Sequence, residues 1–328
     1  MLGKKRVLAV LCIEAMIGGV TNCLAVGQDT EVPYPNVHAS ADRNVVERGR
    51  YLVLNVGVCG HCHSLTNGAP GPDGEVQLSG VQLLRNGIPV DEESPDIRKA
   101  APANAVAFSV PNITSDVKTG IGALSDASIA RTLRFGLTHD GHKVPMMNYA
   151  FADDDLTAVV SYLRATKPVE RQVQRVELKL PPGIVPTATT APPARPLSRS
   201  PRGISVARGR CLVESVADCG ACHTATDMRT GQLSGSRLGG GVSYPDQKNP
   251  QIIYQSANLT RDGRLANWNE NDFVARFRAG PLLDGSPMPW AAYQGMQEND
   301  LRSIYRYLKS LPTGHAAARV SPRAPEPG

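Results

Sequence analysis

Residues 48–63 read RGRYLVLNVGVCGHCH, and residues 208–223 read RGRCLVESVADCGACH. The second stretch repeats the first at an offset of 160 positions, so an internal duplication organises the 328-residue chain. Apolar residues before each Cys pair recur at helical spacing, which predicts a helix that ends just before the cysteines. These residues are Val46, Leu52, Val53 and Val56 in the first copy and Val206, Leu212, Val213 and Val216 in the second.

Each copy ends in a C-x-x-C-H motif, Cys59 to His63 and Cys219 to His223. This spacing is typical of covalent haem attachment, because two thiols must reach two vinyl groups on one porphyrin edge and the next residue must bring its imidazole to the iron. The sequence therefore predicts two covalently bound haem c groups, each with its iron. The predicted attachment residues are Cys59, Cys62, Cys219 and Cys222, and the predicted iron ligands are His63 and His223. A zinc site is the alternative, but a His directly after both Cys pairs argues against it.

Later landmarks repeat with a smaller offset. Asn112-Ile113-Thr114 corresponds to Asn258-Leu259-Thr260 at an offset of 146, and Leu156 lies 145 positions before Leu301. Apolar residues 3, 4 and 7 positions after each of these leucines predict an amphipathic closing helix in each copy. The fall in offset indicates a longer loop in the first copy, and the Gly-, Pro- and Asp-rich stretch 64–111 is predicted to be irregular surface chain.

The sixth coordination position of a haem iron is filled by a protein ligand in an electron carrier. It is open in an enzyme that binds its substrate at the iron. In the second copy Met288, in a Pro-Met-Pro-Trp sequence, is the predicted ligand, because no His occurs between His223 and His315. Met296 and Met228 are weaker candidates there.

In the first copy Met146 is predicted as the sixth ligand over its neighbour Met147, and either Met over His139 and His142. A thioether ligand favours ferrous iron and raises the reduction potential, whereas a second His lowers it. Met ligation in both copies therefore predicts two haems that carry electrons, and no catalytic residue is assigned.

Other residues have more than one interpretation. Arg134 and Arg278 occupy equivalent places and either pair with haem propionates or lie solvated at a helix end. Cys211 stands where the first copy has Tyr51 and is predicted to pack as a small apolar residue. The acidic run 153–155 is predicted to be the solvated start of a helix, where it suits the helix dipole.

These motifs resemble a known family. The stretches that carry the resemblance are 48–52, 112–122, 288–290, 155–163 and 300–308. They are similar to the multihaem cytochrome c subunits of membrane-bound alcohol and gluconate dehydrogenases and to related periplasmic dihaem cytochromes. The resemblance covers about residues 44–168 and 204–312, with two haem motifs where the dehydrogenase subunits usually have three.

The resemblance implies the cytochrome c fold, in which the first and last helices cross over a haem with His and Met ligands. Gly49 and Gly209 would permit this close crossing against Tyr162 and Tyr307. The predicted fold class is therefore mainly α, with two tandem cytochrome c domains that each wrap round one covalent haem.

The predicted domains span residues 40–170 and 203–313. A Pro-rich basic linker, 171–202, joins them, and residues 314–328 are predicted to form a disordered tail. Residues 1–27 are predicted to be a signal peptide, because a basic start precedes an apolar stretch and a small-residue cleavage site.

The leader indicates export to the periplasm. An uncleaved N-terminal anchor, or a lipid on Cys23, would instead hold the protein at the outer face of the inner membrane. The formal net charge of +5 is concentrated in the leader, the linker and the tail, so no nucleic-acid partner is expected.

The predicted function is electron transfer between a periplasmic dehydrogenase, or another donor, and the respiratory chain. The expected partners are redox proteins: a dehydrogenase subunit and an oxidase or a soluble cytochrome. The alternative is a dihaem enzyme such as a cytochrome c peroxidase, which requires an open sixth position and acid–base groups beside it. Turnover of peroxide by the purified protein distinguishes the two.

Overall fold

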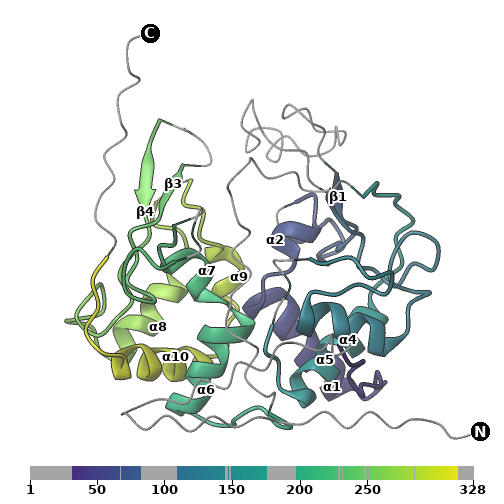
Figure 1. Cartoon of the computed structure of the whole chain (residues 1–328), viewed down its shortest axis with the longest axis horizontal. Coiled ribbons are helices and arrows are strands. Elements are labelled where there is room, and N and C mark those ends of the chain that lie inside the picture. The colour runs from purple at the N-terminus through teal and green to yellow at the C-terminus, as the bar shows by residue number, and fades with distance from the viewer. Residues whose placement is uncertain are drawn as a thin grey trace, which may run out of the picture. The chain divides into compact units, whose positions relative to one another are not determined.

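The computed structural model describes residues 32–316 with internal gaps. The gaps are 67, 83–108, 145–146, 148, 176–196, 228–229, 231, 247–248, 250 and 284. The predicted signal peptide, Met146, Met228, most of the linker and most of the tail therefore lie outside the described residues. The described part is mostly helical with little sheet (Figure 1).

Two similar halves follow one another along the chain. The elements of the first half are α1 (Arg43–Tyr51), the π-helical turn η1 (Leu52–Val56), α2 (Gly60–His63), β1 (Val81–Gln82), β2 (Ser109–Val110), α4 (Asp126–Phe135) and α5 (Asp153–Ala165). The elements of the second half are α6 (Val206–Cys211), the π-helical turn η2 (Leu212–Val216), α7 (Cys219–His223), β3 (Ser243–Pro245), β4 (Ile253–Gln255), α8 (Glu270–Arg278), α9 (Trp290–Tyr293) and α10 (Glu298–Ser310). In each half one pair of short antiparallel strands lies after the C-x-x-C-H motif.

Local sequence explains where the helices begin. Asp42, Ser125 and Ser205 accept hydrogen bonds from backbone N–H groups in the first turns of α1, α4 and α6. Asn269 and Asp272 form a reciprocal capping box at the start of α8. Side-chain oxygens thus satisfy backbone groups that a helix end would otherwise leave without partners.

The first and last helices of each half cross at a glycine. α1 packs on α5, and α6 packs on α10. A Cβ on Gly49 would overlap the carbonyl oxygen of Ala158 and crowd Tyr162, and a Cβ on Gly209 would do the same to Ser303 and Tyr307. The close crossing that the resemblance implied is therefore confirmed in both halves.

The first helix of each half continues as a π-helical turn, and a left-handed residue follows two positions after that turn ends. Val58 has a φ of 44° and Asp218, its equivalent, a φ of 39°. Left-handed backbone is costly for residues with a side chain, most of all for a β-branched one, and such strain concentrates at functional sites. Here it occurs directly before the first cysteine of both motifs.

The stretch 64–111 is less irregular than predicted. Leu78 is almost fully buried, and β1 pairs with β2 within this stretch. Leu78 corresponds to Leu238, which is also buried, so the offset of 160 still holds at this point. The extra length of the first copy therefore enters after residue 82, and residues 83–108 lie outside the described part.

The acidic run 153–155 is not a solvated helix start as a whole. Asp155 is only 1% exposed and pairs with arginine, because the second half covers this end of α5. Asp154 binds the end of the linker, where it accepts hydrogen bonds from the Ser200 amide and from Arg202. The prediction failed since helix-dipole reasoning considers the local helix alone.

The described ends of the linker bind the first half through charge. Arg175 forms an ion pair with Asp140 at 2.6 Å, and Arg202 forms one with Asp154 at 2.8 Å. Both partners belong to the first half. The intervening residues 176–196 lie outside the described part.

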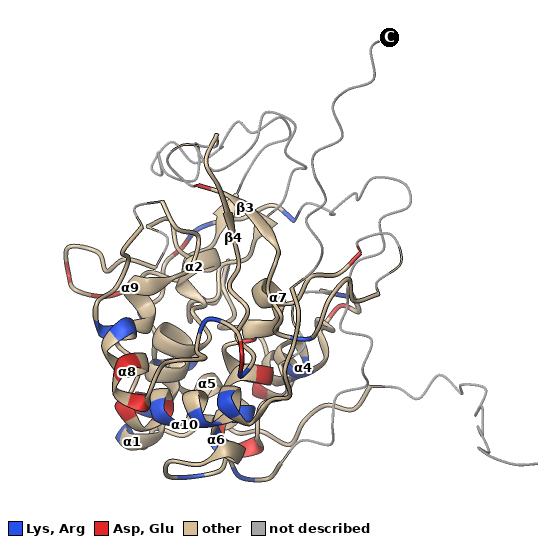
Figure 2. Cartoon of the chain, turned by 90° about the vertical axis from the view of Figure 1, so that its left-hand side faces the viewer, with Lys and Arg blue, Asp and Glu red and all other residues tan. Residues whose placement is uncertain are grey.

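The buried apolar residues of both halves form one continuous cluster. It joins Leu52 and Val56 of η1 to Leu212 and Val216 of η2, and it extends into the closing helices. On the surface of the second half, Arg302 and Arg306 of α10 form ion pairs with Glu270 of α8. Figure 2 marks the acidic and basic positions along these two helices. These ion pairs therefore lie outside the apolar cluster.

Candidate functional site

The two C-x-x-C-H motifs form equivalent helical turns. In α2 the His63 amide donates to the Cys59 carbonyl at 2.9 Å and the Cys62 amide does so at 3.2 Å. One turn of helix brings the two cysteines of a motif to the same side. α7 repeats this turn from Cys219 to His223.

The two motif histidines are held by equivalent hydrogen bonds. His63 Nδ1 lies 2.8 Å from the Pro111 carbonyl oxygen, and His223 Nδ1 lies 2.8 Å from that of Ala257. A carbonyl can only accept, so Nδ1 carries the proton and Nε2 keeps its lone pair for a metal. Burial lowers the pKa of both imidazoles despite this hydrogen bond, which favours the neutral form that ligates metals.

The four motif cysteines are free thiols, and their exposure follows their position in the motif. Cys59 and Cys219 are partly buried, whereas Cys62 and Cys222 are exposed. Burial raises the pKa of the Cys59 and Cys219 thiols to about 12, so these groups are protonated at neutral pH.

A zinc site would require the two Cys pairs, or one pair and further ligands, to converge. Within the described residues, no three His, Cys, Asp or Glu side chains form a group that could hold a metal ion. Two thiols and one metal-ready imidazole in each half instead fit a covalent haem.

A glycine and a leucine adjoin each C-x-x-C-H turn, which is called the attachment turn below after its predicted role, and the sequence analysis did not identify them. The amides of Gly80 and Gly240 donate to the carbonyls of His63 and His223, both at 2.8 Å. Leu78 and Leu238, two residues earlier, are buried in the core. Both glycines have positive φ and lie against the backbone of the residue whose carbonyl binds the histidine, Pro111 or Ala257. The signal was available, because these residues also correspond at the offset of 160.

Met288 lies half-buried beside the core of the second half. The Trp290 amide donates to its carbonyl at 2.7 Å, and the Arg276 guanidinium stacks 3.6 Å from the Trp290 ring centroid. Met288 also lines a cavity of ≈ 180 Å³ together with His61 of the first attachment turn. Met296, in contrast, is 2% exposed and fills the core.

In the first half, Met147 is half-buried, and Met146 lies outside the described residues. The two rival histidines are on a surface turn: His139 and His142 are about half exposed and lie near Asp140. Their position favours a Met ligand in this half.

Arg134 and Arg278 bind the ends of the Met-bearing loops. The sequence analysis did not predict this role. Arg134 is 5% exposed and donates to the Phe151 carbonyl at 2.9 Å and to Asp153 at 2.7 Å. Arg278 donates to the carbonyls of Gln294 and Met296 at 2.6 and 2.7 Å. Each arginine ties the end of a loop to the helix before it, because charged donors bind carbonyl oxygens strongly.

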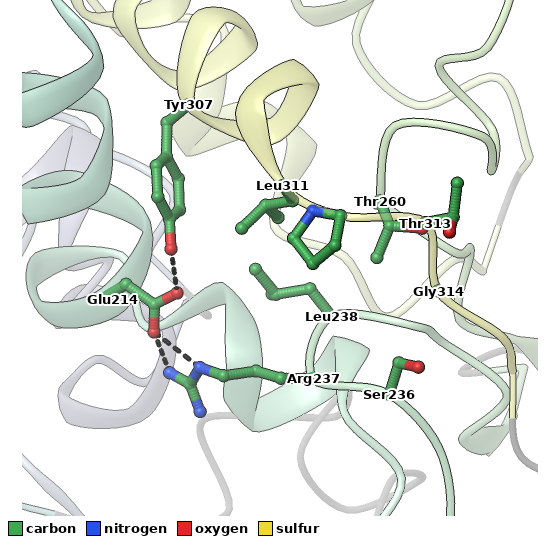
Figure 3. Close-up of a pocket in the computed structure, with 10 residues that line it drawn as sticks. Glu214, Ser236, Arg237, Leu238, Thr260, Tyr307, Leu311, Thr313 and Gly314 are labelled. Carbon is green, nitrogen blue, oxygen red and sulfur yellow. Dashed lines mark hydrogen bonds and ion pairs between the residues drawn. The ribbon is translucent and has the colours of Figure 1, made fainter.

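The second attachment turn has charged neighbours. A Cβ on Gly220 would lie 3.3 to 3.5 Å from the Arg237 guanidinium, which pairs with Glu214, and Glu214 also accepts from Tyr307 at 2.5 Å (Figure 3). These side chains line a cavity of ≈ 160 Å³. Burial raises the pKa of nearby Asp218, although Arg237 opposes the shift. The first half has Leu54, Gln77 and Val58 at the positions of Glu214, Arg237 and Asp218.

The relatives of the chain are c-type cytochromes. It is 27% identical over 300 residues to the gluconate 2-dehydrogenase cytochrome c subunit of Pantoea cypripedii, an alignment that covers 85% of this chain and 62% of that protein. It is 28% identical over 302 residues to the cytochrome c subunit of a quinone alcohol dehydrogenase of Gluconobacter oxydans, covering 86% and 58%. A diheme cytochrome c-type protein of Cereibacter sphaeroides is 26% identical over 285 residues, covering 78% and 82%. No family model matches the chain.

Distant homologues over most of the chain are therefore cytochrome c subunits of dehydrogenases and a dihaem cytochrome c, so the predicted resemblance is confirmed. The chain spans about 60% of the length of the two dehydrogenase subunits. No helix in the described part is both long and apolar enough to cross a bilayer.

Proposed function

We propose that the chain is a periplasmic dihaem cytochrome c that passes electrons from a dehydrogenase, or another donor, toward the respiratory chain. Its relatives are named as cytochrome c subunits of dehydrogenases that oxidise gluconate and alcohol. Redox proteins on both sides are the expected partners, and the leader supports export.

One observation carries this proposal. Two histidines 160 residues apart are each fixed through Nδ1 by a backbone carbonyl at 2.8 Å, directly after a pair of free cysteines. A His held in this way is pre-oriented as a metal ligand. Its duplication with the same geometry argues for two haems and against a chance motif.

The side chains of this chain would hold and tune the cofactor. Cys59 and Cys62 would fix one haem edge, His63 would ligate the iron, and the equivalent residues of the second half would do the same. A bound haem supplies reversible one-electron exchange between ferric and ferrous iron. Leu78 and Leu238 exclude water beside the attachment turns. The Met loops would supply Met146 and Met288, which favour the ferrous form.

Cysteine variants test attachment. Denatured wild-type protein from a haem-competent host should retain two covalent haems by mass spectrometry. Cys62→Ser and Cys222→Ser should each impair attachment of one haem, and the double variant should attach both poorly. Cys211→Ser is the matched control and should retain both, because Cys211 lies outside the motifs. A wild-type mature chain of apo mass would falsify the proposal.

Redox titration tests ligation. Met288→His should lower the potential of one haem strongly and leave the other nearly unchanged, because a second imidazole stabilises ferric iron. Met146→His should affect the other haem. If Met147→His or a change at His142 has that effect instead, the ligand assigned in the first half is wrong.

A further inference from the structure

The landmark residues of the repeat meet in one cluster that joins the two halves. Arg48 Nε donates to Asp155 of its own half at 3.0 Å, and Arg208 Nε donates to Asp300 of its own half at 2.9 Å. Each arginine also reaches the carboxylate of the other half. Arg208 Nη1 lies 3.3 Å from Asp155, and Arg48 Nη1 lies 4.0 Å from Asp300. The side chains of Asp155, Arg208 and Asp300 are 1%, 3% and 8% exposed, so water scarcely screens them.

Tyr51 adds a bond that has no counterpart in the second half. Its hydroxyl donates to Asp300 Oδ2 at 2.8 Å and accepts a hydrogen bond from the Gln297 amide at 3.1 Å. The equivalent residue is Cys211, and the Ser200 hydroxyl instead contacts Arg208 on that side. The repeat therefore differs at a position that contacts the other half.

These bonds connect the segments that carry the haem ligands. Tyr51 ends α1, and the single turn η1 leads from it to Cys59. Gln297 is the N-cap of α10, which follows the Met288 loop and α9. Asn55 of η1 strengthens the connection by donating to the Ala292 carbonyl of α9 at 3.0 Å.

We propose that this cluster, Arg48, Tyr51, Asp155, Arg208 and Asp300, positions the two haem-binding halves relative to each other. It is called the ionic joint below. Electron transfer between the haems depends on the joint, whereas haem attachment and axial ligation within each half do not. The inference rests on the proposed function in one respect, the presence of two haems.

Two gentle variants of the full-length holoprotein test the joint. Tyr51→Phe removes the hydroxyl and keeps the ring and the Arg–Asp pair of each half. Tyr51→Phe removes a hydrogen bond to a buried carboxylate. The fraction of molecules with an open joint should therefore rise by roughly tenfold or more. The rate of electron redistribution after rapid partial reduction should fall several-fold, and Tyr51→Phe/Asn55→Ala should lower it further.

Tyr305→Phe is the matched control, because its hydroxyl donates to the Trp268 carbonyl within the second half. It should leave the transfer rate unchanged. Haem content and the absorption bands of Met ligation should match wild type in all three variants. Unchanged transfer in Tyr51→Phe and in the double variant would overturn the proposal.

A readout without haem separates this inference from the proposed function. The cross-half pair Arg208 and Asp155 should show coupling in a double-mutant cycle of unfolding free energies with Arg208→Gln and Asp155→Asn. Additive effects would overturn the joint even in a protein with two haems. Clear coupling in a protein that binds fewer than two haems would support the joint and reject the dihaem function.

Discussion

Arg278 is expected to keep Met288 on its iron. The guanidinium at the end of α8 donates to the carbonyls of Gln294 and Met296 at 2.6 and 2.7 Å, and the Gln294 side chain donates back to the Arg278 carbonyl at 3.0 Å. The loop that bears Met288 is therefore closed by three hydrogen bonds. Arg278→Gln removes the charge and shortens the side chain, so both guanidinium bonds are lost.

The size of the effect follows from these contacts. A hydrogen bond that involves a charged group contributes about 1.5 to 3 kcal/mol. Arg278 is exposed, so water replaces part of what the two carbonyls lose. A net loss of about 1.5 kcal/mol for the closed loop corresponds to a roughly tenfold larger fraction of detached Met288.

Competition by an external ligand measures this fraction. Imidazole added to the ferric holoprotein must displace the Met, so its apparent affinity for one haem should rise about tenfold in Arg278→Gln. The other haem should be unaffected. Arg306→Gln is the control, because Arg306 loses the same charge but pairs with Glu270 on the helix surface. Imidazole affinity equal to wild type in Arg278→Gln would refute the reasoning.

Three further predictions follow from the same contacts. Gly209→Ala should destabilise the fold by about 1 to 3 kcal/mol in chemical denaturation, because the new Cβ overlaps the Ser303 carbonyl, and wild-type stability would contradict the helix crossing. Arg237→Gln should lower the potential of the second haem alone in a redox titration, since it removes a positive charge beside the attachment turn; a higher potential would contradict this. Burial raises the pKa of Asp300, but Arg208 and the other donors outweigh it, so the folded-state pKa is lowered. Its contribution to stability is therefore full above the unfolded pKa of about 4 and lost as pH falls through the folded value, and Asp300→Asn should flatten the acid limb of a stability–pH curve.

Short-range patterns predicted much of the fold. The apolar spacing before each Cys pair gave the helices that carry Leu52 and Leu212, and the pattern after Leu156 and Leu301 gave the closing helices. Both signals depend on one face of one helix, which a periodicity shows directly. The role of Gly49 and Gly209 in the helix crossing was implied by the resemblance to cytochrome c subunits.

Contacts between the halves were not accessible from those patterns. Asp155 was predicted to be solvated, yet it is buried because Arg208 of the other half approaches it. Arg134 was predicted either to pair with a propionate or to be solvated, and the solvated alternative is wrong, because Arg134 is 5% exposed and donates to the Phe151 carbonyl. Each error concerns a partner that is distant in the sequence. Local helix propensity does not predict such partners.

The divergence of the two copies has a functional consequence. Cys, His and Gly positions of the attachment turn are the same in both halves, but Leu54, Val58 and Gln77 of the first half correspond to charged residues in the second. Two haems with equal attachment and Met ligation would have similar potentials, since axial ligands dominate the potential. Charges at Glu214, Asp218 and Arg237, two of them half-buried and the third exposed, stand at positions that are uncharged in the first half and remove that equality. We therefore expect two distinct potentials in a redox titration, which would give electron flow between the two halves a preferred direction.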